Sequence, residues 1–225
     1  MAHYKRITKR ENFKGPDEFI GFWQKAVLWV REKGDALILP ALGAAVALAL
    51  VLGFFFYRQQ RVASANRELF NILKDLPRPG APSFATPEQM ADALKSHADK
   101  FFGTPSGRIG QLYRANIMCQ KKNWDGAANL YRSLMEGGTD VVAQRAGIGL
   151  ANALQEQGKY ADAISVLEKI RQTSPFAEET DYAIARNQEL NGNKAAAVRE
   201  YQAFAEKHPA SQRAGTARER AAKLS

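Results

Sequence analysis

The sequence predicts an all-α protein in which a single N-terminal transmembrane helix precedes an α-solenoid of about three helix pairs with flanking helices. One observation is a stretch of 22 residues, 36–57, that contains no charged side chain. The other is a recurrence of glycine, small and bulky apolar residues with a period of about 34 toward the C terminus. The 225 residues, 45% hydrophobic and 24% charged, have the composition of a globular chain with one or two modest cores.

Residues 1–35 are expected to form a basic cytoplasmic tail that contains an interfacial amphipathic helix over about 17–33. The apolar residues of this helix recur at helical spacing: Phe19, Ile20, Phe22, Trp23, Ala26, Val27 and Val30. Lys25, Arg31 and Lys33 fall on its other faces. A basic helix directly before a span is typical of a segment that lies in the lipid headgroup layer. The alternative is an ordinary helix that packs on the surface of a partner.

Residues 36–57, ALILPALGAAVALALVLGFFFY, are predicted to be the transmembrane helix. At a rise of 1.5 Å per residue they cover about 33 Å, enough for a hydrocarbon core of about 30 Å. Pro40 is expected in the first turn, where a missing N–H costs little, and Phe54 to Tyr57 at the far interface. A buried helix of a soluble protein is the alternative. A cleaved signal peptide fits less well, because this stretch follows 35 residues and ends in aromatic residues.

The orientation of the span is inferred from the basic residues on its two sides. Eight Lys or Arg residues precede the span, and Arg58, Arg61, Arg67 and Lys74 follow it closely. The balance near the span does not decide the orientation, but every charge of a short N-terminal segment counts, and long C-terminal domains translocate largely regardless of charge. The N terminus is therefore expected in the cytoplasm and the rest of the chain across the membrane, with the reverse orientation as the alternative.

Residues 58–107 are expected to contain linking helices and a proline-rich break. The sequence RVASANRELFNILKDL reads as a helix, PRPGAPSFATP contains four prolines, and a further helix begins near Glu88. The prolines exclude regular structure over most of the break. The sequence GTPSG ends the helix that begins near Glu88 and opens the next one.

Residues 108–209 are predicted to be the helical repeats, and residues 210–225 a C-terminal capping helix. Small residues mark three successive helix pairs, with steps of 36 and then 34 residues: Ala115, Ala151 and Ala185 in the first helices, and Ala127, Ala163 and Ala197 in the second. A unit of two antiparallel helices with this period cannot bury its own apolar face. Each unit therefore needs a neighbour, and the units are expected to stack.

The middle unit resembles the tetratricopeptide repeat. It has Leu150, Ala151, Leu154, Gly158, Tyr160, Ala163, Leu167, Ile170 and Pro175 at the spacing of that family. The third unit has Lys194 where the family has a corner aromatic, and the first unit lacks the turn glycine and the closing proline. The resemblance implies that ten residues pack the repeats together: Ala115, Trp124, Ala127, Ala151, Gly158, Tyr160, Ala163, Ala185, Gly192 and Ala197.

The order of segments also resembles a narrower group, the YfgM-like inner-membrane proteins of bacteria. This resemblance extends over most of the chain. It rests on the segment FWQKAVLWVREKGDALILPALGAAVALAL, followed by YRQQRVASANRELFNIL and then by the repeats. It implies a single-pass protein of the bacterial inner membrane with a periplasmic repeat domain, ancillary to the SecYEG translocon and a partner of periplasmic chaperones. The sequence departs from the group in its longer N-terminal tail and its proline-rich break.

Nothing in the sequence indicates a catalytic residue, a cofactor or a metal site. The three histidines fall in different elements, Glu178 and Glu179 suit a helix start, and no nucleotide-binding, hydrolase or metalloprotease motif occurs. The lone Cys119 excludes an internal disulfide and is expected to pack within a helix. The net charge of +9 is dispersed among acidic residues, so nucleic acid is not expected as a partner. No small-molecule substrate is expected either.

Protein partners are therefore the remaining expectation, and the first helices of the repeats supply the candidate residues. Asn116, Asn152 and Arg186 each follow a register alanine, and Ile148 and Tyr182 lie one turn earlier. Such a ladder would hold the backbone of an extended peptide; the alternative is that these are solvated polar positions. The predicted function is a membrane-tethered scaffold that recruits periplasmic chaperones or client segments beside the Sec translocon. The alternative is a structural subunit of an outer-membrane, cell-wall or division assembly complex.

Overall fold

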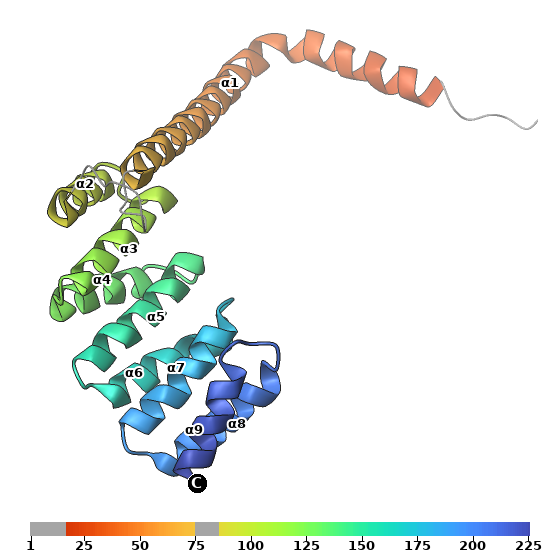
Figure 1. The fold of residues 1–225 in the computed structure, drawn as a ribbon. Helices are drawn as coiled ribbons and strands as arrows, with labels where there is room; N and C mark the ends of the chain where they lie inside the picture. The colour runs from red at the N-terminus through yellow and green to blue at the C-terminus, as the bar shows by residue number, and fades with distance from the viewer. Residues whose placement is uncertain (1–16, 75–85) are drawn as a thin grey trace, which may run out of the picture. The chain divides into compact units, whose positions relative to one another are not determined.

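The structure, a computed structural model, describes residues 17–74 and 86–225, and Figure 1 shows their path. Within these ranges it contains nine α-helices and no β-strand: α1 (Asp17–Lys74), α2 (Pro87–Lys100), α3 (Pro105–Gln120), α4 (Trp124–Glu136), α5 (Val141–Glu156), α6 (Tyr160–Arg171), α7 (Ala177–Leu190), α8 (Lys194–Lys207) and α9 (Ala214–Leu224). The all-α class and the helical-repeat arrangement predicted from the sequence are confirmed. The first 16 residues of the basic tail and residues 75–85 of the proline-rich break lie outside the described residues.

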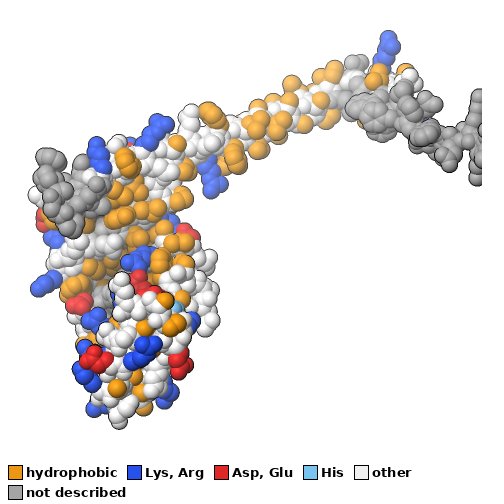
Figure 2. Space-filling model, turned by 45° about the vertical axis from the view of Figure 1, so that its right-hand side comes forward, with side chains coloured by type: hydrophobic (Ala, Val, Ile, Leu, Met, Phe, Trp, Pro, Cys, Tyr) orange, Lys and Arg blue, Asp and Glu red, His pale blue; other side chains and the backbone are white. Residues whose placement is uncertain are grey.

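The chain divides into two compact units, residues 1–59 and residues 60–225. In the first unit the charge-free stretch is helical, and its apolar side chains cover the helix surface while basic side chains flank them (Figure 2). The apolar window of this helix has a mean hydropathy of 2.5 and none of it is buried. A core helix of a soluble protein would be mostly covered by its own chain, and this window is not. The helix is long and apolar enough to cross a membrane.

Helix α1 is longer than the predicted span on both sides. It includes the residues expected to form a separate interfacial helix, about 17–33, and it continues to Lys74 through most of the helix expected after the span. The sequence placed Pro40 in a first helical turn, and that placement was wrong because Pro40 lies inside α1. Proline is tolerated inside membrane helices because side chains and local adjustments satisfy the carbonyl that it leaves without a donor.

The second unit is a stack in which each helix from α2 onward packs against the next one along the chain (Figure 1). The six register alanines have no exposed surface: Ala115, Ala127, Ala151, Ala163, Ala185 and Ala197. A methyl side chain lets two helix backbones approach closely, so small residues recur where successive helices cross. Helices α3 to α7 share one apolar cluster, and α7 to α9 share a second one around Tyr201 and Phe204.

The turns between the paired helices use the left-handed backbone conformation at equivalent positions. Gly158 and Gly192 have φ of +74° and +78°, values that glycine adopts without steric cost. The first unit lacks this glycine, yet its backbone makes the same turn with Lys122 at a φ of +59°. An L-residue in this conformation costs roughly 1–2 kcal/mol. The stacking geometry therefore imposes the turn even where the sequence does not favour it.

Candidate partner-binding groove

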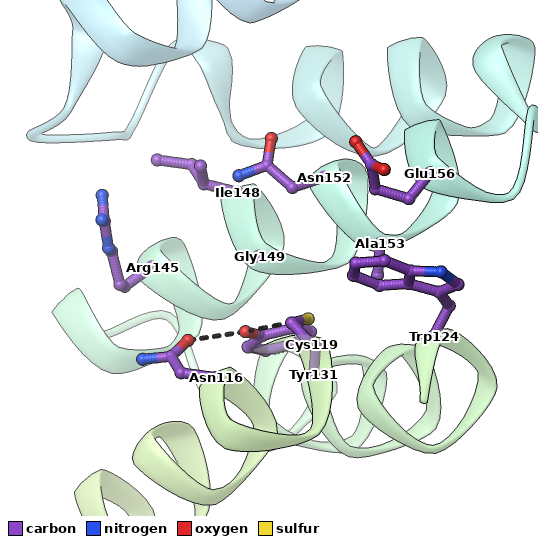
Figure 3. A pocket seen from close by; sticks show the side chains of 10 residues that line it. All are labelled: Asn116, Cys119, Trp124, Tyr131, Arg145, Ile148, Gly149, Asn152, Ala153 and Glu156. Carbon is purple, nitrogen blue, oxygen red and sulfur yellow. Dashed lines mark hydrogen bonds between the residues drawn. The ribbon is translucent and has the colours of Figure 1, made fainter. Parts of the chain in front are cut away.

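A pocket of about 230 Å³ lies between helices α3, α4 and α5 (Figure 3). Its lining comes from the C-terminal half of α3, from α4 and from one face of α5: Asn116, Cys119, Trp124, Tyr131, Arg145, Ile148, Gly149, Asn152, Ala153 and Glu156. Arg145 and Trp124 lie at opposite ends of the pocket in Figure 3. The pocket thus combines two amides, an apolar base and one charge of each sign.

Helix α5 places its lining residues by helical spacing. Asp140 caps the start of the helix, since its carboxylate accepts a hydrogen bond from the backbone N–H of Ala143 at 2.9 Å. Lining residues then recur every three or four positions along α5, which places them on one face. Asn152 is exposed at the middle of this face, and Ile148 is only 1% exposed, so that Ile148 contributes to the base of the pocket.

Tyr131 fixes the orientation of the Asn116 amide. Its buried hydroxyl donates a hydrogen bond to Asn116 Oδ1 at 2.6 Å, and burial raises the pKa of Tyr131, so the phenol stays neutral and able to donate. The ring lies against the backbone of Gly149, where a Cβ atom would be 2.6 Å from the ring carbons. Glycine at position 149 therefore makes room for the tyrosine. With its oxygen engaged, Asn116 presents its Nδ2 group as a donor.

Cys119 lies beside the same tyrosine. Its Sγ atom is 3.7 Å from the Tyr131 oxygen and donates the weak hydrogen bond between them. Burial raises the pKa of the Cys119 thiol, which keeps it protonated. Because the thiolate is the reactive form, Cys119 has the properties of a packing residue, and the pocket contains no activated thiol among its lining residues.

Arg145 is shared between this pocket and a second hollow of about 700 Å³. Its guanidinium pairs with Glu179 on α7 and lies 5.3 Å from the centre of the Phe176 ring. The second hollow is lined by Arg145, the start of α7 and the loop between α8 and α9: Phe176, Glu178, Glu179, Ala210, Ser211, Gln212 and Arg213. Arg145 lies in the wall of both hollows, and the two hollows are together called the groove.

The structure brings together three of the five residues that the sequence singled out for partner binding. Asn116, Ile148 and Asn152 line the first pocket, whereas Arg186 and Tyr182 line neither hollow. Arg186 is exposed on α7. The ring of Tyr182 packs edge-on against two aromatic rings of the last cluster, with centroids 5.8 Å from Tyr201 and 5.2 Å from Phe204.

Sequence reasoning missed two charged residues of the pocket, Arg145 and Glu156. A signal for both was present, because they lie three and four residues from Ile148 and Asn152 and so share their face of α5. Tyr131 was missed for a different reason. It belongs to α4, the second helix of its unit, and only the packing of α4 against α5 brings it into the pocket.

One arrangement outside the groove has the residue types of a hydrolase. His97 Nε2 lies 3.1 Å from Ser106 Oγ, and His97 Nδ1 lies 3.6 Å from a carboxylate oxygen of Glu68. His97 and Ser106 are buried, and neither lines the two hollows described above, so the hydroxyl is not open to a substrate. The described residues also contain no group of three metal-binding side chains. These three residues join the end of α1 to α2 and α3.

The stacked helix pairs and the groove along their first helices define a helical-repeat protein of the protein-binding class. The comparison with known families is more specific: the profile of the tetratricopeptide repeat-like domain matches residues 28–217, most of the chain. The chain belongs to this family. No curated protein matches the sequence closely. The repeat domain is a protein-interaction module of a kind that is typically non-catalytic.

Proposed function

We propose that this protein is a non-catalytic, membrane-tethered scaffold that holds an extended segment of a partner protein in the groove along α3 and α5. The observation that carries this proposal is the position of Asn116 and Asn152, two exposed amides from successive first helices in one pocket. An amide side chain can both donate to and accept from a peptide backbone. Two such groups on neighbouring helices suit an extended chain, whose own backbone groups are unpaired.

The chemistry of the pocket favours an internal, uncharged stretch of the partner. Between the two amides the surface is formed by Ile148, Gly149 and Ala153, with the Trp124 ring at one end. Arg145 is already paired with Glu179, so it is not available as a free partner for a terminal carboxylate. An apolar side chain of the bound segment would lie in the pocket while the amides hold its backbone.

The partners and the compartment follow from the segments around the groove. The apolar helix supports attachment to a membrane, and the eight basic residues before it support a cytoplasmic N terminus with the repeats in the periplasm. The resemblance to YfgM-like proteins supports periplasmic chaperones or client segments beside the Sec translocon as the partners, and the bacterial inner membrane as the location.

The test uses a photo-crosslinking amino acid in the full chain, expressed in its native membrane. It replaces Asn152 in one variant and Arg186 in a control variant, since both residues are exposed and occupy the same repeat position but only Asn152 lines the groove. We expect position 152 to crosslink to a protein that mass spectrometry identifies as a chaperone, a client or a translocon subunit. Equal crosslinking of the same fixed neighbour at both positions would instead favour the structural-subunit function.

A further inference from the structure

The turn between α2 and α3 exposes an aromatic side chain that the packing of the repeats does not use. Phe102 is 78% exposed, the highest value among the large apolar residues described within residues 60–225. Its neighbour Phe101 is buried and anchors the turn, and Gly103, with φ of +77°, reverses the chain. A phenylalanine left in water forgoes the favourable free energy of burying its ring. A rigid turn that holds Phe102 outward therefore suggests that something other than water covers it.

Arg61 fixes the position of this turn along α1. Its Nη2 atom donates hydrogen bonds to the backbone oxygens of Lys100 at 3.3 Å and of Phe102 at 3.5 Å. The last carbonyls of a helix have no partner within the helix, and a cation there also interacts favourably with the helix dipole. Arg61 thus caps the C-terminal end of α2. The turn is held within the length of one arginine side chain from residue 61.

Residue 61 is close in sequence to the end of the apolar stretch. Arg61 comes four residues after Tyr57, the last residue of the charge-free stretch. Four residues cover about 6 Å as a helix and at most about 14 Å when fully extended. The headgroup layer on each side of a bilayer is itself about 5–8 Å thick. Whatever the direction in which the repeats leave the span, chain length alone keeps the turn near the headgroups.

The residue types around the turn fit a lipid surface. Aromatic side chains are enriched at membrane interfaces, where the ring is accommodated between headgroups and acyl chains. Arg58 and Arg67 are exposed on the same part of the chain. Basic residues near an anionic surface are attracted to it. An exposed aromatic ring on a turn that chain length keeps near the span matches the headgroup layer better than it matches a protein surface.

We infer that Phe102 inserts into the lipid headgroup layer and makes the α2–α3 turn a second membrane contact of the chain, beside the span. This inference rests on the membrane tether of the proposed function. A helix that crosses the bilayer leaves the attached domain free to rotate and tilt. A second contact through Phe102 restricts that freedom and sets which side of the repeats faces the membrane.

The test places one fluorophore at a time on the full chain in vesicles of three parts phosphatidylcholine to one part phosphatidylglycerol. Cys119→Ala removes the native thiol, and Phe102→Cys, Leu190→Cys and Leu48→Cys each carry a nitrobenzoxadiazole label. All three replaced side chains are exposed, and Leu190 is two repeats away from the turn. The label itself has a flat apolar ring. Circular dichroism checks that each variant is folded, and lipids with a nitroxide near the headgroup serve as quencher.

We expect the nitroxide lipid to reduce the emission of the label at position 102 about twofold, as for a group 5–10 Å deep, and to leave the label at 190 unchanged. The label at 48 reports on the span alone, through lipids that carry the nitroxide deep in the acyl chain. Quenching at 48 without quenching at 102 would overturn the Phe102 contact and keep the tether. An absence of quenching at 48 would overturn the tether itself. If the label at 102 is protected from aqueous iodide but is not quenched by the nitroxide lipid, a protein surface rather than lipid covers position 102, and the inference is overturned.

Discussion

Asp181 on α7 accepts a hydrogen bond from the guanidinium of Arg171, at the end of α6, with an Nε to Oδ1 distance of 2.9 Å. The carboxylate is 3% exposed, and its other oxygen accepts from Lys207 at 2.8 Å and from His208 at 2.9 Å. Arg171 also pairs with Glu200 on α8 at 2.8 Å. One buried carboxylate therefore joins the middle repeat to the last one.

The first prediction concerns the substitution Asp181→Asn in residues 60–225, a compact unit of the fold. Asparagine has the same shape but removes the buried charge that Arg171 and Lys207 share, although Arg171 keeps its pair with Glu200. Loss of one member of a buried ion pair costs about 3–5 kcal/mol. Urea unfolding monitored by circular dichroism should show that the free energy of unfolding falls by an amount near the lower end of this range. Glu168→Gln is the matched control, because Glu168 pairs with the same arginine at the surface. A surface pair contributes about 0–1 kcal/mol, and equal losses for the two variants would contradict the prediction.

The second prediction is the pH dependence of this stabilisation. Burial of Asp181 would by itself raise its pKa, but hydrogen bonds from Lys207, His208 and Arg171 outweigh burial and hold the pKa below the usual value of about 3.9. A carboxyl with a lowered folded-state pKa stabilises fully above its unfolded pKa and loses that contribution as the pH falls through the folded pKa. The difference in free energy of unfolding between parent and Asp181→Asn should therefore shrink as the pH falls from about 5 to about 3. A difference that grows toward low pH would have the wrong sign.

The third prediction concerns the turn at Lys122. Lys122→Gly should remove roughly 1–2 kcal/mol of left-handed strain and lose about 0.5–1 kcal/mol to the greater freedom of unfolded glycine. The net result is an increase in the free energy of unfolding of up to about 1.5 kcal/mol. Lys122→Ala is the control, since it removes the same side chain but keeps the strain. If alanine stabilised the repeats as much as glycine, the side chain rather than the backbone would be responsible.

The fourth prediction concerns Gly149. Gly149→Ala places a Cβ atom 2.6 Å from the Tyr131 ring, so the ring must move and its hydrogen bond to Asn116 is disturbed. We expect this overpacking to lower the free energy of unfolding by about 1–3 kcal/mol. Gly215→Ala in α9 is the matched control, because a Cβ atom there meets nothing within 4 Å. Gly215→Ala should raise the free energy of unfolding by about 0.5–1 kcal/mol, because alanine is favoured over glycine at an open helix position. Thermal unfolding of both variants distinguishes the two signs.

The period of the sequence predicted the helix pairs because each pair must bury the same kind of face against its neighbour. The six register alanines, all fully buried, show how directly small side chains at crossing points reflect the packing. The extent of α1 was less predictable. The sequence predicted an interfacial helix that ends near residue 33 and a separate span from residue 36 with Pro40 in its first turn, but α1 continues through this whole region.

The groove was predicted in part, for a physical reason. The repeat position identifies the residues on the first helices, and Asn116 and Asn152 do meet in one pocket. The repeat position does not predict which of these residues are covered by neighbouring aromatic side chains. Tyr182 packs against Tyr201 and Phe204, and Arg213 from beyond α8 lies 5.1 Å above its ring. At the position that Ile148 takes in the base of the pocket, the last repeat therefore has an aromatic ring packed against its neighbours, while Arg186 stays exposed outside both hollows.

Helix α9 closes the stack with the smallest side chains available. Its buried residues are Ala214, Ala217 and Ala221, and its one ion pair to the preceding repeat, Arg220 with Glu189, lies at the surface. Three methyl groups bury little area, and a surface pair adds about 0–1 kcal/mol. Fraying of the array therefore begins at its C-terminal end, where amide hydrogens should exchange first, while the helices around Asp181 stay closed. Local unfolding is thus expected to start at the end of the array that is farther along the chain from α1.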